Sequence, residues 1–127
     1  METKTFFIDI DGTILKQYPF TDIENCQTTE DMESITEPFD VAIRRINEWF
    51  SEGHHVVFTT ARPESFREFT VEQLAFCGVQ YSQLVMGIGR STRVLINNLS
   101  DDEPNETRAQ AYQVYKNDKN AFTLIDE

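Results

Sequence analysis

Short hydrophobic runs alternate with amphipathic stretches along the chain. Residues 3–10 ("TKTFFIDI") and 54–60 ("HHVVFTT") are apolar and rich in β-branched and aromatic side chains, a composition typical of buried strands. Between these runs, hydrophobic residues recur at three- and four-residue spacing over residues 36–50, which predicts an amphipathic helix ended by Gly53. The first half of the chain is therefore predicted to fold as strand, helix, strand.

The same alternation continues in the second half. Residues 65–78 begin with Ser65 and Glu68 in the spacing of a capping box and end on Gly78, which predicts another helix. The remaining predicted elements are strands at 82–88, 92–98 and 121–127 and a helix at 105–118. Residues 13–35 carry few apolar side chains and predict a long polar loop.

Strands separated by helices predict a single α/β domain over residues 1–127, with a parallel sheet covered on both faces. The expected architecture is a three-layer α/β/α sandwich around a Rossmann-like sheet of about five strands. Ligands bind such sheets at the carboxyl ends of the strands, so polar residues that follow the strands are the candidates for function. The loop 13–35 is the internal candidate for a flap over this edge.

Charge and cysteine content narrow the classes of partner and compartment. With 22 acidic and 11 basic side chains, the formal charge is −11, which disfavours nucleic acid and anionic membrane surfaces. A small phosphorylated ligand is compatible with this charge if local cations or a metal offset it. Cys26 and Cys77 are expected to be free thiols in a reducing cytoplasm, with a single disulfide as the alternative. We expect no bilayer-spanning run and no secretory signal in "METKTFF".

Two aspartates, Asp9 and Asp11, follow the first predicted strand in "FFIDIDGTIL". If the strand ends near Asp9 and the chain turns at Gly12, both carboxylates can face the same crevice. Two carboxylates this close repel each other unless a proton or a cation lies between them. A divalent ion with oxygen ligands, most simply Mg²⁺, would resolve the conflict, and one carboxylate could then act as nucleophile while the other handles a proton.

The order of "DIDGTIL" and "VVFTTARP" resembles the haloacid dehalogenase-like superfamily, mostly phosphohydrolases with an aspartate nucleophile and magnesium. The segments "GHHVVFTTAR" and "LVMGIGRSTRVLINN" are similar to those of small capless members associated with capsule or surface-sugar biosynthesis. The resemblance covers nearly the whole chain and implies a core without a cap domain.

The resemblance implies roles for particular residues. Asp9 would attack phosphorus and carry a transient aspartyl phosphate. Asp11 would protonate the leaving oxygen and then activate water, with its backbone carbonyl on the metal. Gly12 and Thr13 belong to the same signature beside the transferred group, and Thr60 would donate a hydrogen bond to a phosphoryl oxygen.

Arginines supply the remaining candidates for substrate contact. Arg62 could clamp the phosphate, because a guanidinium fork matches phosphate oxygens. The superfamily also places a lysine or arginine before its fourth strand to neutralise the intermediate. Arg90 is the first candidate for that position in this chain, and Arg93 is the second.

The fourth motif departs from the pattern of the family. Asn97 and Asn98 occupy positions where relatives carry one or two acids that complete the magnesium site. An asparagine offers a carbonyl oxygen without a charge. Either Asp101 or Asp102 replaces the missing ligand, or asparagine is tolerated, or the protein binds phosphorylated ligands with little turnover.

Two hypotheses follow for the function. The first is a magnesium-dependent phosphomonoesterase acting on a small phosphorylated metabolite, with a sugar phosphate as one candidate. The second is a phosphate-binding or regulatory module that lost efficient chemistry. A receiver domain of a signalling relay is disfavoured, because no aspartate follows the middle predicted strand. An oligomer is compatible with the sequence but is not indicated by it.

Overall fold

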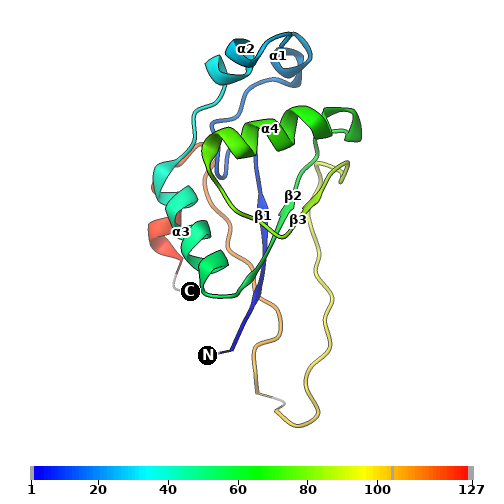
Figure 1. The fold of residues 1–127 in the computed structure, drawn as a ribbon. Helices are drawn as coiled ribbons and strands as arrows, with labels where there is room; N and C mark the ends of the chain where they lie inside the picture. Colours follow the sequence, from blue (N-terminus) through cyan, green and yellow to red (C-terminus); the bar gives the residue numbers. More distant parts are fainter. Residues whose placement is uncertain (1, 104, 126–127) are drawn as a thin grey trace.

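Three parallel strands form the centre of the computed structural model, which describes residues 2–103 and 105–125 (Figure 1). They are β1 (Thr5–Asp9), β2 (His55–Thr59) and β3 (Gln83–Val85), in the order β1-β2-β3. Each lies within a segment that the hydrophobic pattern predicts as a strand. The α/β class and the parallel sheet are therefore confirmed.

The alternation of side chains along the strands creates one apolar face of the sheet. Ile8 pairs with Phe58, and Phe58 pairs with Leu84, so these three side chains lie on the same face. They contact the hydrophobic core, in which Ile8 and Phe58 are buried. The position of the core therefore follows from the two-residue period of the strands.

Helix α3 (Asp40–Ser51) covers this face, as its periodicity predicts. Its buried side chains are Ala42, Ile43, Ile46 and Trp49. The Trp49 ring stacks on Phe6 of β1 with ring centroids 4.1 Å apart. The helix begins later than expected, because the residues before it pair with the chain after β1: Phe39 N–H donates to Ile14 O at 2.8 Å.

Helix α4 (Arg67–Cys77) connects β2 to β3, and Gly78 ends it in the left-handed conformation, with φ 70°. The predicted capping box of Ser65 and Glu68 is wrong. A 3₁₀ turn, η1 (Glu64–Phe66), precedes the helix, so Ser65 lies inside that turn instead of at the N-cap.

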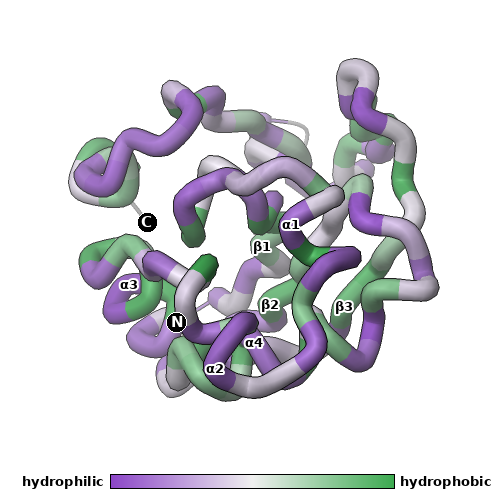
Figure 2. The backbone as a smooth tube through the Cα atoms, turned by 90° about the horizontal axis from the view of Figure 1, so that it is seen from above, coloured by the Kyte–Doolittle hydropathy of each residue, from purple (hydrophilic) through white to green (hydrophobic). Residues whose placement is uncertain are grey.

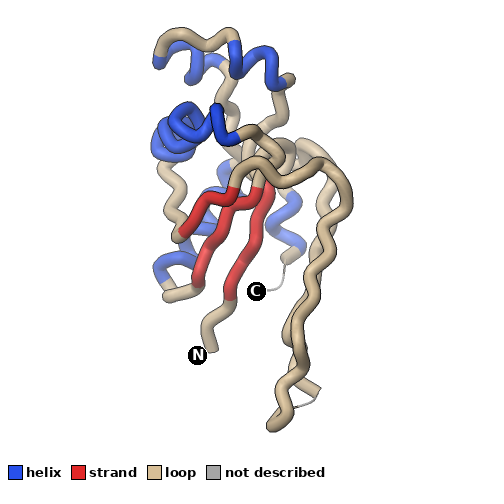
Figure 3. The backbone as a smooth tube through the Cα atoms, turned by 90° about the vertical axis from the view of Figure 1, so that its right-hand side faces the viewer, coloured by secondary structure: helices blue, strands red, loops and turns tan. Residues whose placement is uncertain are grey.

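The polar loop 13–35 contains two short helices, α1 (Phe20–Glu24) and α2 (Thr29–Ser34). A capping box stabilises α2, in which Thr28 and Asp31 exchange hydrogen bonds with each other's backbone. Both helices lie beyond the carboxyl ends of the strands (Figures 1 and 3), and both are mostly hydrophilic (Figure 2). This position fits the expected flap.

Three predicted elements of the second half are wrong. Residues 92–98 form no strand, and residues 105–118 form no helix. Residues 86–103 and 105–114 instead run past the sheet as an extended excursion (Figures 1 and 3). The predicted strand at 121–127 is replaced, over its described residues 121–125, by a 3₁₀ helix, η2 (Ala121–Leu124). Ala121 and Phe122 of this helix are buried against the core. Residues 126–127 lie outside the described part.

These differences leave the second face of the sheet without a covering helix, although Val57 of the central strand is buried on it. Figure 3 looks onto this face, with no helix in front of the strands. Phe7 is 59% exposed there and Val85 is 44% exposed. Across the described residues the sheet therefore has three strands instead of about five, and helices cover one face instead of two. A strand needs a paired neighbour and a short helix needs a packing surface, neither of which a local pattern specifies.

Cys26 and Cys77 are both free and half-buried. In the described ranges, no helix has the length and apolar character needed to cross a membrane.

The core predicts the effect of a truncation in α3. Replacing Ile46, which is fully buried, with alanine should lower the free energy of unfolding by about 2–5 kcal/mol through lost burial and a cavity. Urea denaturation measures this loss. Arg44→Ala on the exposed side of the same helix is the control, expected within about 0.5 kcal/mol of wild type. Equal losses in both variants would contradict this packing.

Candidate active site

The two aspartates lie where β1 ends and the chain turns sharply. Asp9 is the last residue of β1, and the N–H groups of Thr13 and Ile14 both donate to Ile10 O, at 3.1 and 3.0 Å. Gly12 has a φ of 82°, which few residues with a side chain adopt. This turn brings Asp11 back towards the carboxyl edge of the sheet, where the sequence predicts a site.

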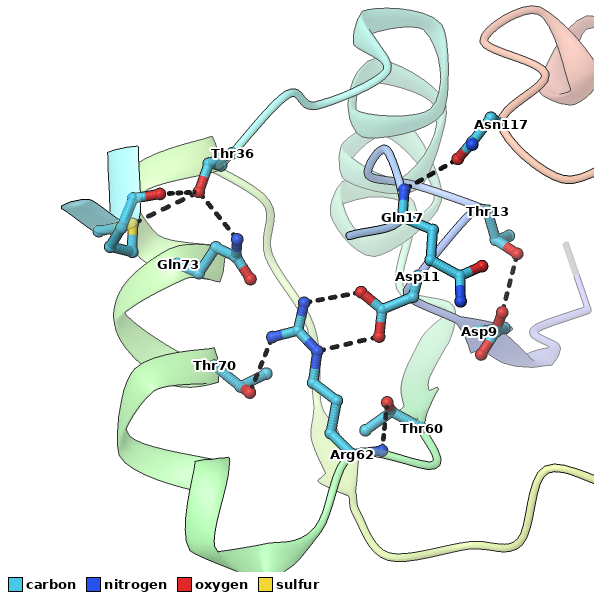
Figure 4. A network of polar contacts seen from close by, with 11 residues as sticks. Asp9, Asp11, Thr13, Gln17, Thr36, Thr60, Arg62, Thr70, Gln73 and Asn117 are labelled. Atoms are coloured by element: carbon cyan, nitrogen blue, oxygen red, sulfur yellow. Dashed lines mark hydrogen bonds and ion pairs between the residues drawn. The ribbon is translucent and has the colours of Figure 1, made fainter. Parts of the chain in front are cut away.

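Asp9 is exposed at the end of β1, and its carboxylate has no ion-pair partner within 4 Å in the described structure. Thr13 Oγ1 donates to Asp9 Oδ2 at 3.0 Å, and Oδ1 has no side-chain partner among the residues drawn (Figure 4). Desolvation raises the pKa of Asp9, and the negative charge of Asp11 raises it further. Hydrogen bonds from Thr13 and from the backbone of Ile10, and the charge of Arg93, lower this pKa without cancelling the rise.

Asp11 is in a different state, because Arg62 neutralises it. Arg62 Nε donates to Asp11 Oδ2 at 3.0 Å, and Nη2 donates to Oδ1 at 2.8 Å (Figure 4). Arg62 Nη1 donates to Thr70 Oγ1 on α4 at 3.0 Å. The arginine side chain is only 2% exposed, so its guanidinium faces the protein and not the solvent. This differs from the expectation that Arg62 clamps a phosphate, because Asp11 and Thr70 already accept the hydrogen bonds of its guanidinium.

Thr60 follows β2 and lies beside Arg62, as the sequence predicts. It is 1% exposed, its N–H donates to Val85 O at 3.0 Å, and its Oγ1 accepts from Arg62 N–H at 3.1 Å. The hydroxyl proton of Thr60 is not used by these bonds. A hydrogen bond from Thr60 to a phosphoryl oxygen stays a prediction.

A second layer of polar side chains connects the site to the flap. Gln73 on α4 is 2% exposed, and its Nε2 donates to Thr36 Oγ1 at 2.8 Å. Thr36 Oγ1 in turn donates to Met32 O of α2 at 2.6 Å. These bonds tie the end of the flap to the helix that holds Arg62 (Figure 4).

Arg90 and Arg93, the two candidates for the neutralising cation, occupy different surroundings. The Arg90 guanidinium lies over the ring of Phe20 in α1, 4.4 Å from its centroid, and Phe20 also contacts Phe66 edge-on at 5.7 Å. Arg93 is close enough to Asp9 to lower the pKa of that carboxyl. Of the two, Arg93 is therefore the one whose charge acts on Asp9, whereas Arg90 contacts α1.

The predicted magnesium ligands are gathered only in part. Asp9 and Asp11 lie together, whereas Asn97, Asn98 and Asp102 are exposed in the excursion after β3. In residues 2–103 and 105–125, no group of three acidic, histidine or cysteine side chains is arranged to hold a metal. Magnesium is usually bound by one or two carboxylates together with water and substrate phosphate. The carboxylate of Asp9 and the backbone of Asp11 fit that smaller set.

Comparisons with family models, with curated proteins and with solved structures gave no match. The assignment of function therefore depends on the geometry of this chain.

Sequence reasoning missed Thr70, Gln73, Lys116 and Asn117. Thr70 and Gln73 are polar residues three positions apart within a helix, and both are fully or almost fully buried. Two polar positions on one helical face at that spacing are a signal that could have indicated a buried partner. Lys116 and Asn117 gave no such signal, because their partners Gly12 and Gln17 lie near the other end of the sequence.

Removing the buried arginine should destabilise the fold. Arg62→Ala leaves Asp11 and Thr70 without their partner, and we expect a loss of about 3–5 kcal/mol in the free energy of unfolding. Arg67 is 42% exposed, makes a two-bond contact with Glu64 and donates to Leu84 O at 3.1 Å, so Arg67→Ala is the control, with a smaller loss of about 1 kcal/mol. Similar losses in a denaturant titration would contradict the burial of Arg62.

The raised pKa of Asp9 predicts a pH-dependent gain in stability for Asp9→Asn. Because the folded pKa lies above the unfolded one, folding is favoured below the unfolded pKa, and this advantage is lost as pH rises through the folded pKa. The variant should therefore melt above wild type at pH 7, and the difference should vanish near about pH 3. Glu72→Gln on the exposed side of α4 should give no such trend. A variant less stable than wild type at pH 7 would refute the assignment.

Proposed function

We propose that this chain is a magnesium-dependent phosphomonoester hydrolase of the haloacid dehalogenase-like type, with Asp9 as the nucleophile. The observation that supports it most is the contrast between the two aspartates. Asp11 is neutralised and fixed by Arg62, whereas Asp9 is exposed and keeps a raised pKa at the carboxyl edge of a parallel sheet. Paired carboxylates in such different environments are typical of a site where each performs a separate task.

The steps assigned to the residues follow from this contrast. Asp9 Oδ1 attacks phosphorus, forming an acyl phosphate as the bond from phosphorus to the ester oxygen breaks. Asp11, carrying a proton on a lone pair that Arg62 leaves free, gives that proton to the leaving oxygen. It then takes one from the water that attacks the same phosphorus, which releases inorganic phosphate and restores Asp9.

Arg62 acts as a positioning residue in this scheme. Each carboxylate oxygen has two lone pairs, and Arg62 occupies only one on each oxygen of Asp11. Proton transfer by Asp11 can use a lone pair that the guanidinium leaves open. The arginine thus fixes the orientation of Asp11 without contacting the substrate.

Magnesium would be held by the Asp9 carboxylate and the Asp11 backbone carbonyl, and when bound it would offset the negative charge of the phosphoryl group. Asn97, Asn98 or Asp102 would reach this site only if the excursion after β3 moved towards β1. Their role as ligands stays a prediction.

The surroundings of the site favour a small substrate. The segment with α1 and α2 lies beyond the strand ends (Figure 1), where we propose that it restricts access to this edge. The formal charge of −11 disfavours a long polyanion. A phosphorylated metabolite, with a sugar phosphate as one candidate, and a cytoplasmic location remain part of the proposal.

A phosphate-binding module without turnover is the second candidate. The pairing of Asp11 with Arg62 favours it, because both oxygens of Asp11, the residue that would serve as the acid, already accept hydrogen bonds from the Arg62 guanidinium. The two candidates share the binding site and differ in whether a phosphate ester is cleaved.

We expect wild type to release p-nitrophenol slowly from p-nitrophenyl phosphate with magnesium, and to lose this activity on addition of a chelator. Asp9→Asn should reduce the rate by at least about 10³-fold, because the amide is not a nucleophile. The assay follows p-nitrophenol by absorbance, and Glu72→Gln should match wild type.

Equal rates in wild type and Asp9→Asn would contradict the proposed nucleophile. A wild type that binds tungstate, an inert mimic of phosphate, but cleaves no phosphate ester with magnesium would favour the second candidate.

A further inference from the structure

A turn near the C-terminus lies against the aspartate-bearing turn. Asp118 N–H donates to Tyr115 O at 3.1 Å, which places Lys116 and Asn117 at the corner of the turn. Asn117 N–H donates to Gly12 O at 2.8 Å, and Asn117 Oδ1 accepts from Gln17 N–H at 2.8 Å (Figure 4). Asn117 therefore holds both sides of the loop that follows Asp11.

Asn117 adopts an unusual backbone conformation. Its φ is 62°, and no other non-glycine residue in the described part of the chain has a positive φ. Asparagine is among the residues that tolerate this region, and such conformations persist where neighbouring contacts enforce them. The two hydrogen bonds that Asn117 makes with Gly12 and Gln17, in the turn after Asp11, are contacts of that kind.

Lys116 packs directly on Gly12. A Cβ atom at Gly12 would lie 3.1 Å from Lys116 Cγ, so the absence of a side chain at position 12 makes room for the lysine stem. Beyond Cγ the side chain still has two methylene groups and its ammonium group. Lys116 is exposed, so these groups are free to extend from Gly12 along the turn that carries Asp11.

A cation at this place would complement the negative charge of the site. Asp9 and Asp11 are both acidic, and a phosphate monoester adds further negative charge. Arg62 is committed to Asp11, and Arg90 lies over Phe20. Two of the described basic residues near this edge of the sheet, Arg93 and Lys116, remain to face the ligand.

We propose that Lys116 binds the phosphoryl group of the substrate and that Asn117 is the positioning residue that holds it there. This inference rests on the proposed phosphatase function. An ammonium group suits this task because it is a compact charge that donates three hydrogen bonds to phosphate oxygens.

Tungstate binding, measured by calorimetry on the full chain with magnesium, tests the inference independently of turnover. Lys116→Met keeps most of the stem and removes the charge, so it should weaken binding about tenfold, the effect of one charged hydrogen bond. Lys116→Arg should stay within about threefold of wild type. Lys119→Met removes an exposed lysine three residues away and should bind as wild type.

The role of Asn117 is tested by a pair of variants. Asn117→Gly keeps the positive φ and the bond to Gly12, and should bind tungstate nearly as wild type. Asn117→Ala does not favour that conformation and should weaken tungstate binding of the folded protein. If Asn117 were merely structural, Asn117→Ala would lower the melting temperature and leave the affinity unchanged.

Each outcome decides the inference. Binding by Lys116→Met equal to wild type overturns it, and if wild type still cleaves p-nitrophenyl phosphate, the proposed function stands without it. A wild type that neither binds tungstate nor cleaves the ester overturns both. Lysine-dependent binding without turnover supports Lys116 and rejects the enzyme.

Discussion

The buried ion pair between Arg62 and Asp11 is the interaction on which the site depends. A guanidinium only 2% exposed costs free energy unless its donors are satisfied, and here Asp11 and Thr70 satisfy three of them. Arg62 comes from the loop after β2, Asp11 from the turn after β1, and Thr70 from α4. One side chain thus joins the three segments at the carboxyl edge of the sheet, and Gln73 and Thr36 extend the connection to the flap.

In the proposed function, the aspartate that is not neutralised, Asp9, is the nucleophile. Asp9 pairs with no such cation, and desolvation raises its pKa although Thr13 and Arg93 partly oppose the effect. Holding Asp9 charged where desolvation raises its pKa lowers the free energy of unfolding, and burial in the core of β1, β2 and α3 offsets that loss. This division separates a fixed Asp11 from an accessible Asp9. It gives a physical reason for assigning positioned proton transfer to one residue and nucleophilic attack to the other.

The sequence predicted the elements that carry their own local signals. The strands β1 and β2 are short apolar runs, and α3 has a regular apolar stripe, so each could be recognised without knowledge of its partners. Residues 92–98 and 105–118 have equally suggestive patterns but lie outside the sheet and its helices, because pairing and packing depend on distant neighbours. The location of Asp9 and Asp11 was predictable for the same local reason. The orientation of Arg62 and the contact of Lys116 with Gly12 were not, since both depend on residues far away in sequence.

A crystal structure of the protein with magnesium and beryllium fluoride, a mimic of an acyl phosphate, tests the central claim most directly. The account predicts density for the fluoride complex bonded to Asp9 Oδ1, while Arg62 keeps its two bonds to Asp11. A beryllium fluoride group bonded to Asp11, or a crystal in which Arg62 has left Asp11 to contact the ligand, would contradict it.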